Sequence, residues 1–214
     1  MKKLLTAALT LVATPALAHH PLAGAPMETF AHGMLSGVGH PILGFDHLFF
    51  ILAIGIAALF TGAPRLAPLG YVAGMLGGCV LIMAGVTLPA VEVVIALSLV
   101  IVGAVLMSGQ ALKLPTALAL FAGFGLFHGW AFGGTITGQE GGMSAAVISG
   151  YLIGLAAIQW VIAIMAGWIT GSVLLSQTAE DMPARLAGGL VAGAGTFLVL
   201  EHAEGAAFAM LGLG

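Results

Sequence analysis

Two imidazoles and a carboxylate precede a long apolar run in this sequence. His40, Asp46 and His47 lie in the stretch HPILGFDH, and the apolar residues 48–60 follow directly. Ionisable side chains are costly in a hydrocarbon environment, so a chain that keeps them beside such a run usually uses them. Imidazole nitrogens suit nickel, copper, zinc and iron, and a carboxylate adds a charged oxygen ligand. The stretch therefore predicts a site for a divalent transition metal.

The spacing within this motif leaves two alternatives open. In a regular helix His40 and His47 would share a face but lie about 10 Å apart along the axis. That is too far for both to bind one ion at ligand distances of about 2 Å. Either Pro41 and Gly44 break the helix and fold His40 back toward Asp46 and His47, or the motif supplies two successive stations on an entry path.

A third candidate histidine, His128, lies in the stretch FHGWAFG, residues 127–133. On its own, His128 in an apolar helix could make an interhelical hydrogen bond or bind a metal. With Asp46 and His47 expected at a similar depth, we interpret it as a fourth ligand. Glu92, which Ser98 follows, is either the partner of a helix end or a residue on the ion path.

Other polar residues are weaker candidates. Additional residues of a transport path would be Glu140, Glu201, His202 and Glu204, although the last three also fit a hydrated helix end. Capture of metal outside the membrane could involve His19, His20 and His32, or these histidines could have no role.

The composition is typical of a polytopic membrane protein. Of the 214 residues, 60% are hydrophobic and 6% charged, whereas a soluble domain has about 25% charged residues. The absence of a basic patch argues against nucleic-acid binding, and no nucleotide-binding motif is present. Residues 1–18 read as a secretory signal that is cleaved before His19, with an uncleaved anchor as the alternative. The mature chain, 19–214, is then expected to be one membrane domain.

We predict an all-α fold, a six-helix transmembrane bundle. The spans are placed at about 42–61, 68–87, 91–109, 116–135, 145–173 and 185–210, each long enough for a bilayer that needs about 20 residues. After cleavage the basic residues are Arg65, Lys113 and Arg185, in the first, third and fifth connections. The positive-inside rule puts these connections in the cytoplasm and both mature termini in the periplasm. Glycines four apart, such as Gly70/Gly74, Gly129/Gly133 and Gly189/Gly193, predict close helix packing.

At these residues the sequence resembles the HupE/UreJ family of nickel/cobalt permeases. The match lies in His40-Pro41-x-x-Gly44-x-Asp46-His47, in Pro89-x-x-Glu92 with Ser98 following, and in Phe127-His128-Gly129-x-Ala131-x-Gly133. The resemblance implies secondary uptake of Ni²⁺, sometimes Co²⁺, across the inner membrane for hydrogenase or urease maturation. It also implies metal recognition by His40, Asp46, His47 and His128, with Glu92 as a further acid. Where the family often has a glutamate after its glycines, this chain has Thr135, and Glu140 lies five residues further on.

Three hypotheses follow for the function. The first is a permease, not an enzyme, that carries the metal as substrate and has no tightly bound cofactor. Its uptake should weaken below about pH 6.5, because ligating histidines must be deprotonated. The second is an intramembrane zinc-dependent hydrolase that uses the same His/Asp cluster, with Glu92 or Glu140 as general base. The third is a periplasm-facing metal sensor or structural subunit. The oligomeric state, including a homo-oligomer, stays open.

Overall fold

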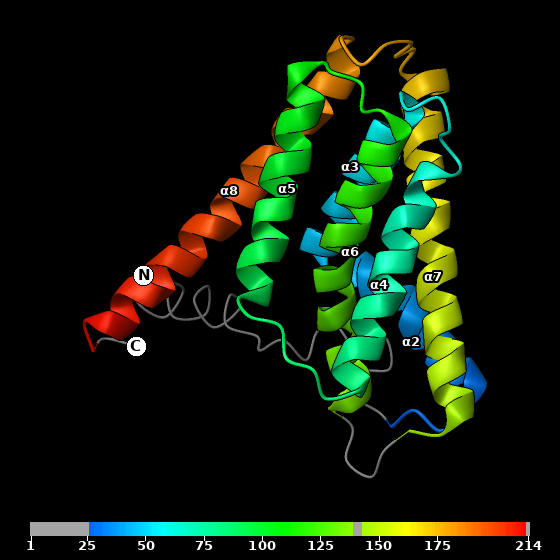
Figure 1. Cartoon of the computed structure of the whole chain (residues 1–214), viewed down its shortest axis with the longest axis vertical. Helices are drawn as coiled ribbons and strands as arrows, with labels where there is room; N and C mark the ends of the chain where they lie inside the picture. Colours follow the sequence, from blue (N-terminus) through cyan, green and yellow to red (C-terminus); the bar gives the residue numbers. More distant parts are fainter. Residues whose placement is uncertain (1–25, 139–142, 213–214) are drawn as a thin grey trace, which may run out of the picture.

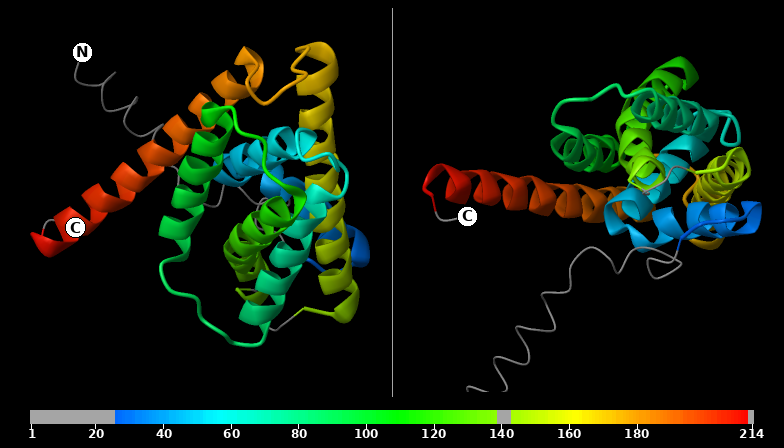
Figure 2. Two further views of the ribbon diagram at one scale, coloured as in Figure 1. Left: turned by 45° about the horizontal axis from the view of Figure 1, so that its top comes forward. Right: turned by 90° about the horizontal axis from the view of Figure 1, so that it is seen from below.

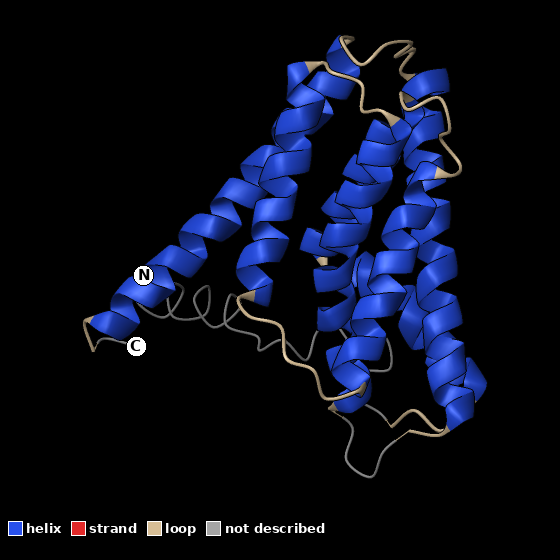
Figure 3. Ribbon diagram, viewed as in Figure 1, coloured by secondary structure: helices blue, strands red, loops and turns tan. Residues whose placement is uncertain are grey.

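The computed structural model describes residues 26–138 and 143–212, and within these ranges all regular structure is helical (Figure 3). The helices run as follows: α2 (Phe30–Leu43), α3 (Phe45–Leu59), α4 (Ala67–Met83), α5 (Val91–Ser108), α6 (Leu114–Thr137), α7 (Ala145–Trp168), a short π-helix η2 (Ile169–Val173) and α8 (Met182–Met210). The prediction of an all-α chain is confirmed.

The count of membrane spans is lower than the six expected. In the described part of the chain, four segments are long and apolar enough to cross a bilayer: Val91–Ser108, Leu114–Thr137, Ala145–Val173 and Met182–Met210. The bent pair α2–α3 makes a fifth if it is counted as one span. The expected span 68–87 corresponds to α4, which has 17 residues and ends at Met83 before a turn at Gly85. The chain is a multi-pass membrane protein, but six full spans are not confirmed.

Prolines and small polar residues set most helix starts. Pro68, Pro115 and Pro183 occupy the first turns of α4, α6 and α8, where the missing N–H of proline costs no helical hydrogen bond. The Ser144 side chain caps α7 by accepting from the N–H of Val147. Such capping satisfies backbone donors that have no partner within the helix. The expected boundaries of these helices are therefore close to those observed.

The first expected span, 42–61, is interrupted at Gly44, as one of the two alternatives for the motif allowed. Gly44 has an extended backbone (φ −87°, ψ 102°) between α2 and α3, and the two helices meet at 82°. The N–H of Gly44 still bonds to the carbonyl of His40 at 3.1 Å, which closes the last turn of α2. The break that the first alternative required is thus present at Gly44, and whether His40 shares one site with Asp46 and His47 stays a prediction. Helix α2 itself was not anticipated, because its glycines and polar residues resemble an extramembrane segment.

The helices pack in three closely associated pairs, α4 with α6, α2 with α7, and α5 with α8, and α3 lies between α7 and α5 (Figure 1). Glycines make the first of these pairs tight: a Cβ at Gly74 would overlap the backbone of Ala122, and one at Gly129 the backbone of Met75. Close packing through glycines is thereby confirmed for α4–α6. It is wrong for Gly189 and Gly193, which meet at most a distant side-chain atom. The first half of α8 packs on α5, and its second half extends away from the bundle (Figures 1 and 2).

Three connections lie at the same end of the bundle, the top of Figure 1: α3–α4 with Arg65, α5–α6 with Lys113, and α7–α8, which leads to Arg185 in the first turn of α8. There the guanidinium of Arg185 donates from Nε to the carbonyl of Met107 at 2.9 Å, which joins α8 to α5. The connection before α8 is held by Asp181, whose Oδ2 accepts from the N–H groups of Gln177 (2.7 Å) and Thr178 (2.8 Å). These bonds, that of Thr178 first, hold the pKa of Asp181 below its usual range.

Candidate metal site

The break at Gly44 brings the two histidines of the first motif to the same region. The ring centroids of His40 and His47 are 6.3 Å apart, compared with the roughly 10 Å expected along an unbroken helix. The buried ring of Phe132 from α6 contacts both, at centroid distances of 5.1 Å to His40 and 4.2 Å to His47. The bent pair therefore presents both imidazoles to the middle of α6.

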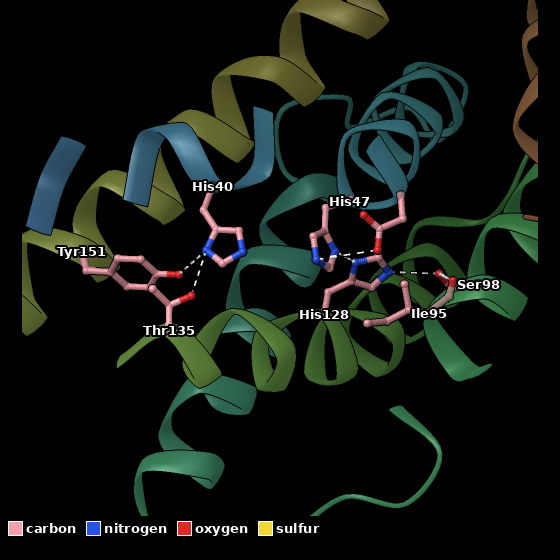
Figure 4. Close-up of polar contacts among 8 residues, drawn as sticks. His40, His47, Ile95, Ser98, His128, Thr135 and Tyr151 are labelled. Carbon is pink, nitrogen blue, oxygen red and sulfur yellow. Dashed lines mark hydrogen bonds and ion pairs between the residues drawn. The ribbon is translucent and has the colours of Figure 1, made fainter. Parts of the chain in front are cut away.

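His47 and His128 are joined directly in the buried interior. Their Nδ1 atoms are 2.8 Å apart, which is a hydrogen bond between α3 and α6 (Figure 4). The other ring nitrogen of His128, Nε2, is 3.0 Å from Oγ of Ser98 on α5. Ser98 and His128 are fully buried, and His47 is nearly so. One chain of polar contacts thus links three helices at the depth of the motif.

Asp46 is the charged member of this group. Its Oδ2 lies 3.8 Å from Nε2 of His47, the ring nitrogen that His128 does not contact. The side chain is 27% exposed, while that of His47 is 10% exposed. The carboxylate is therefore more exposed than the imidazole pair beside it. It lies in the first turn of α3, where the helix dipole also favours a negative charge.

His40 has a separate set of polar neighbours. Its Nδ1 is 3.1 Å from Oγ1 of Thr135 on α6 and 3.1 Å from the hydroxyl of Tyr151 on α7 (Figure 4). The Tyr151 hydroxyl in turn donates to the carbonyl of Phe132 at 2.9 Å. Since that proton is used, the Tyr151 oxygen is an acceptor toward His40. Thr135, the position where the chain departs from the family pattern, is thus a direct neighbour of His40.

Aromatic rings close off the inner side of the imidazole pair. Phe50 stacks on His128 with centroids 4.4 Å apart and an interplanar angle of 22°. Tyr71 contacts the same ring edge to face at 5.9 Å. The Tyr71 hydroxyl is buried and has no hydrogen-bond partner in the structure. Such a group costs free energy where it is unpaired, so it is available to a polar ligand that enters.

The described residues do not form a ready-made multidentate metal centre. Among the parts of the chain that the structure describes, no three His, Cys, Asp or Glu side chains come close enough together to hold one ion. His47 and Asp46 are adjacent, His128 is bonded to His47, and the ring centroid of His40 is 6.3 Å from that of His47. A bound cation would need His40 or another donor to approach this pair.

The remaining candidates lie at the edge of this cluster, apart from it or outside the described residues. Glu92 is exposed in the first turn of α5 and is near enough for its charge to act on the His47 imidazole. In the second half of α8, Glu201, His202 and Glu204 are exposed, away from the buried face of that helix. His32 accepts from the N–H of Glu28 at the start of α2. His19, His20 and Glu140 lie outside the described residues, and the metal roles of all these residues stay predictions.

Sequence reasoning missed two residues of this region. Tyr151 was not considered, although a tyrosine within an apolar helix usually places its hydroxyl on a polar partner. Thr135 was noted only as a departure from a family pattern, and its contact with His40 needed the bend of α2. Ser98, which the sequence presents only as a residue that follows Glu92, is the buried partner of His128.

Comparison with known proteins agrees with the motifs. The sequence model of the family described as "HupE / UreJ protein" matches residues 7–198. The chain is also 32% identical over 204 residues to "Protein HupE" of Rhizobium leguminosarum bv. viciae, which covers 92% of this chain and 97% of that protein. No solved structure matches the chain. On the extent of these matches and the motifs that underlie them, the chain belongs to the HupE/UreJ family.

Proposed function

We propose that this chain is a secondary permease that takes up a divalent transition metal, Ni²⁺ or Co²⁺, from the periplasm to the cytoplasm. The observation that carries the proposal is the contact of Asp46 with the ring nitrogen of His47 that His128 leaves open, 3.8 Å away in a nearly buried setting. A carboxylate beside an imidazole nitrogen suits these cations. Membership in a family associated with nickel and cobalt uptake supports the same cargo.

The arrangement supports a transport path with two stages. His40, held by Thr135 and Tyr151, lies on the α2 side of Phe132. Asp46 and His47 lie on its α3 side, with His128 completing the cluster. A cation would exchange hydration water for His40 first and then for the Asp46–His47 pair. Within residues 26–138 and 143–212, fewer than three candidate ligands adjoin one another, which suits a site that must release its ion as well as bind it.

The membrane potential is sufficient as a driving force. A divalent ion that moves inward across 100 mV gains about 4.6 kcal/mol, twice the value for a single charge. The connections with basic residues, one of them containing Arg65, lie at the opposite end of the bundle from the start of α5. By the positive-inside rule we place that basic end in the cytoplasm of an inner membrane.

The alternative of a zinc hydrolase receives no support. A catalytic zinc site needs three protein ligands and an open position for water, and the described residues contain no such group of three. The family is one of membrane accessory and transport proteins. Delivery to hydrogenase or urease maturation stays a proposal drawn from the family alone.

Nickel uptake into proteoliposomes tests the permease. The purified chain is reconstituted, a potential is imposed, and entry of Ni²⁺ is followed with an internal fluorescent chelator. We expect Asp46→Asn and His47→Ala to reduce uptake at least tenfold, because each removes a proposed ligand. Glu180→Gln is the matched control, since this exposed acid lies in the connection at the basic end. Equal uptake by all four proteins, or uptake no faster than into empty liposomes, would refute the proposal.

A further inference from the structure

Ser98 fixes the position of one proton in the buried polar chain. Its Oγ is 2.6 Å from the backbone carbonyl of Ile95. A carbonyl only accepts, so the single hydroxyl hydrogen of Ser98 is donated there. The same Oγ lies 3.0 Å from Nε2 of His128 and can therefore only accept from it. The Nε2 atom of His128 carries a hydrogen.

This proton determines the tautomer of the next ring. A neutral imidazole has one N–H, so Nδ1 of His128 carries a lone pair. The partner at 2.8 Å is Nδ1 of His47, and this atom must then be the donor. Both ring nitrogens of His128 are thereby used, Nε2 to donate to Ser98 and Nδ1 to accept from His47.

As a result, the second ring nitrogen of His47 presents a lone pair toward Asp46. With its hydrogen on Nδ1, His47 has an unprotonated Nε2, and this is the atom 3.8 Å from Oδ2 of Asp46. Two acceptors that face each other without a hydrogen between them form a place for a cation. Metal-bound histidines commonly donate their second N–H to a partner that fixes ring and tautomer, and His128 provides that partner here.

We propose that Ser98 and His128 are positioning residues that hold His47 in its Nδ1–H tautomer, so that His47 Nε2 and Asp46 are the atoms that bind the divalent cation at the second stage of the path. This inference rests on the proposed function and deepens it. It assigns His128 a role through His47 instead of direct ligation in this conformation. It also gives Ser98, which sits on a different helix from both histidines, an effect on metal affinity.

The tautomers can be measured without any transport. The full chain in nanodiscs, free of metal and with ¹⁵N-labelled histidine, is studied by NMR at pH 8. We expect His47 to be protonated at Nδ1 and His128 at Nε2. Assignment is by loss of signals in His47→Ala and His128→Asn. A wild-type His47 protonated at Nε2 would overturn the proposal.

Ser98→Ala tests the relay itself. Without the hydroxyl acceptor, we expect mixed tautomers at His47 and a roughly tenfold weaker affinity for Ni²⁺ measured by titration, as for other second partners of metal-binding histidines. Ser108→Ala is the matched control, because Ser108 makes the same bond to a carbonyl three residues earlier in α5, at 2.7 Å, and is exposed. A Ser98→Ala protein with the tautomers and Ni²⁺ affinity of Ser108→Ala would refute the relay.

A second pair of variants separates positioning from ligation. The side-chain oxygen of asparagine can accept where Nδ1 of His128 accepts, whereas alanine offers nothing. We expect His128→Asn to bind Ni²⁺ more tightly than His128→Ala and to leave the number of imidazoles on bound Cu²⁺, counted by pulsed EPR, as in the wild type. Loss of one imidazole in His128→Asn would refute the positioning role. Expected tautomers with no metal flux in the wild type would refute the permease and leave the assignment of His47 Nε2 intact.

Discussion

Adding one methyl group at Gly129 should separate two helices and disconnect the imidazole pair. An ideal Cβ at this position would lie 2.5 Å from the carbonyl carbon and 2.6 Å from Cα of Met75, and closer still to the Met75 oxygen. Ordinary contacts between carbon atoms are about 3.5 Å or longer. Backbone cannot move aside as a side chain can, so α4 and α6 must part by about 1 Å in Gly129→Ala.

The size of the effect follows from this displacement. Overpacking of a tight interface costs about 1–3 kcal/mol. His128 precedes Gly129, and a shift of about 1 Å would stretch its 2.8 Å bond to His47 beyond the hydrogen-bonding range. We therefore expect Gly129→Ala to lower both the melting temperature and the affinity for Ni²⁺.

Thermal unfolding in detergent and Ni²⁺ titration are the two assays. The control is Gly134→Ala in the same helix, where a Cβ would meet no atom within 4 Å. Alanine in an open helical position should be neutral or slightly stabilising. The reasoning about α4–α6 contact would fail if Gly129→Ala melted and bound Ni²⁺ like Gly134→Ala.

Three further results are expected. Because the pKa of Asp181 is lowered in the folded state, its charge stabilises the fold fully above about pH 4. This stabilisation is lost as the pH falls through the lowered pKa. The melting temperatures of the wild type and of Asp181→Asn should therefore converge on acidification. Gln159 is fully buried, and both polar atoms of its amide are unpaired. Since an unpaired polar group costs about 1–3 kcal/mol, Gln159→Leu should raise the melting temperature. A melting temperature below that of the wild type would contradict this. Tyr151→Phe removes the bonds to His40 and to a backbone carbonyl, so thermal unfolding should show a loss of about 1–2 kcal/mol, and an unchanged stability would contradict it.

The sequence predicts the helices better than it predicts the bend. Long apolar runs ended by prolines and glycines give the bounds of α5, α6 and α8 within a few residues, because burial in lipid and loss of helical hydrogen bonds are both local properties. Pro41 also draws attention to a break, yet the chain remains helical through Pro41 and turns at Gly44. Whether the chain bends at Pro41 or at Gly44 depends on how α2 packs against α7. No local pattern in the sequence reports that packing.

The candidate site divides in the same way. His40, Asp46, His47 and His128 are identifiable from sequence because polar groups are rare and costly in apolar helices. Their arrangement is not, since the His47–His128 bond and the contacts of His40 depend on how three helices approach one another. Glu201 and its neighbours, the additional candidates for the transport path, do not lie at this cluster, because the second half of α8 leaves the bundle.

The pairing of the helices has a mechanical consequence. His40 and His47 lie on α2 and α3, which both pack on α7; His128 belongs to the α4–α6 pair, and Ser98 to the α5–α8 pair. The two hydrogen bonds that connect His47 through His128 to Ser98 therefore each join one packed unit to another. Any inward opening that keeps the units intact must part them along these bonds. The hydrogen bonds that set the proton positions would then also hold the closed conformation together. They would break when the units part and form again when the units close.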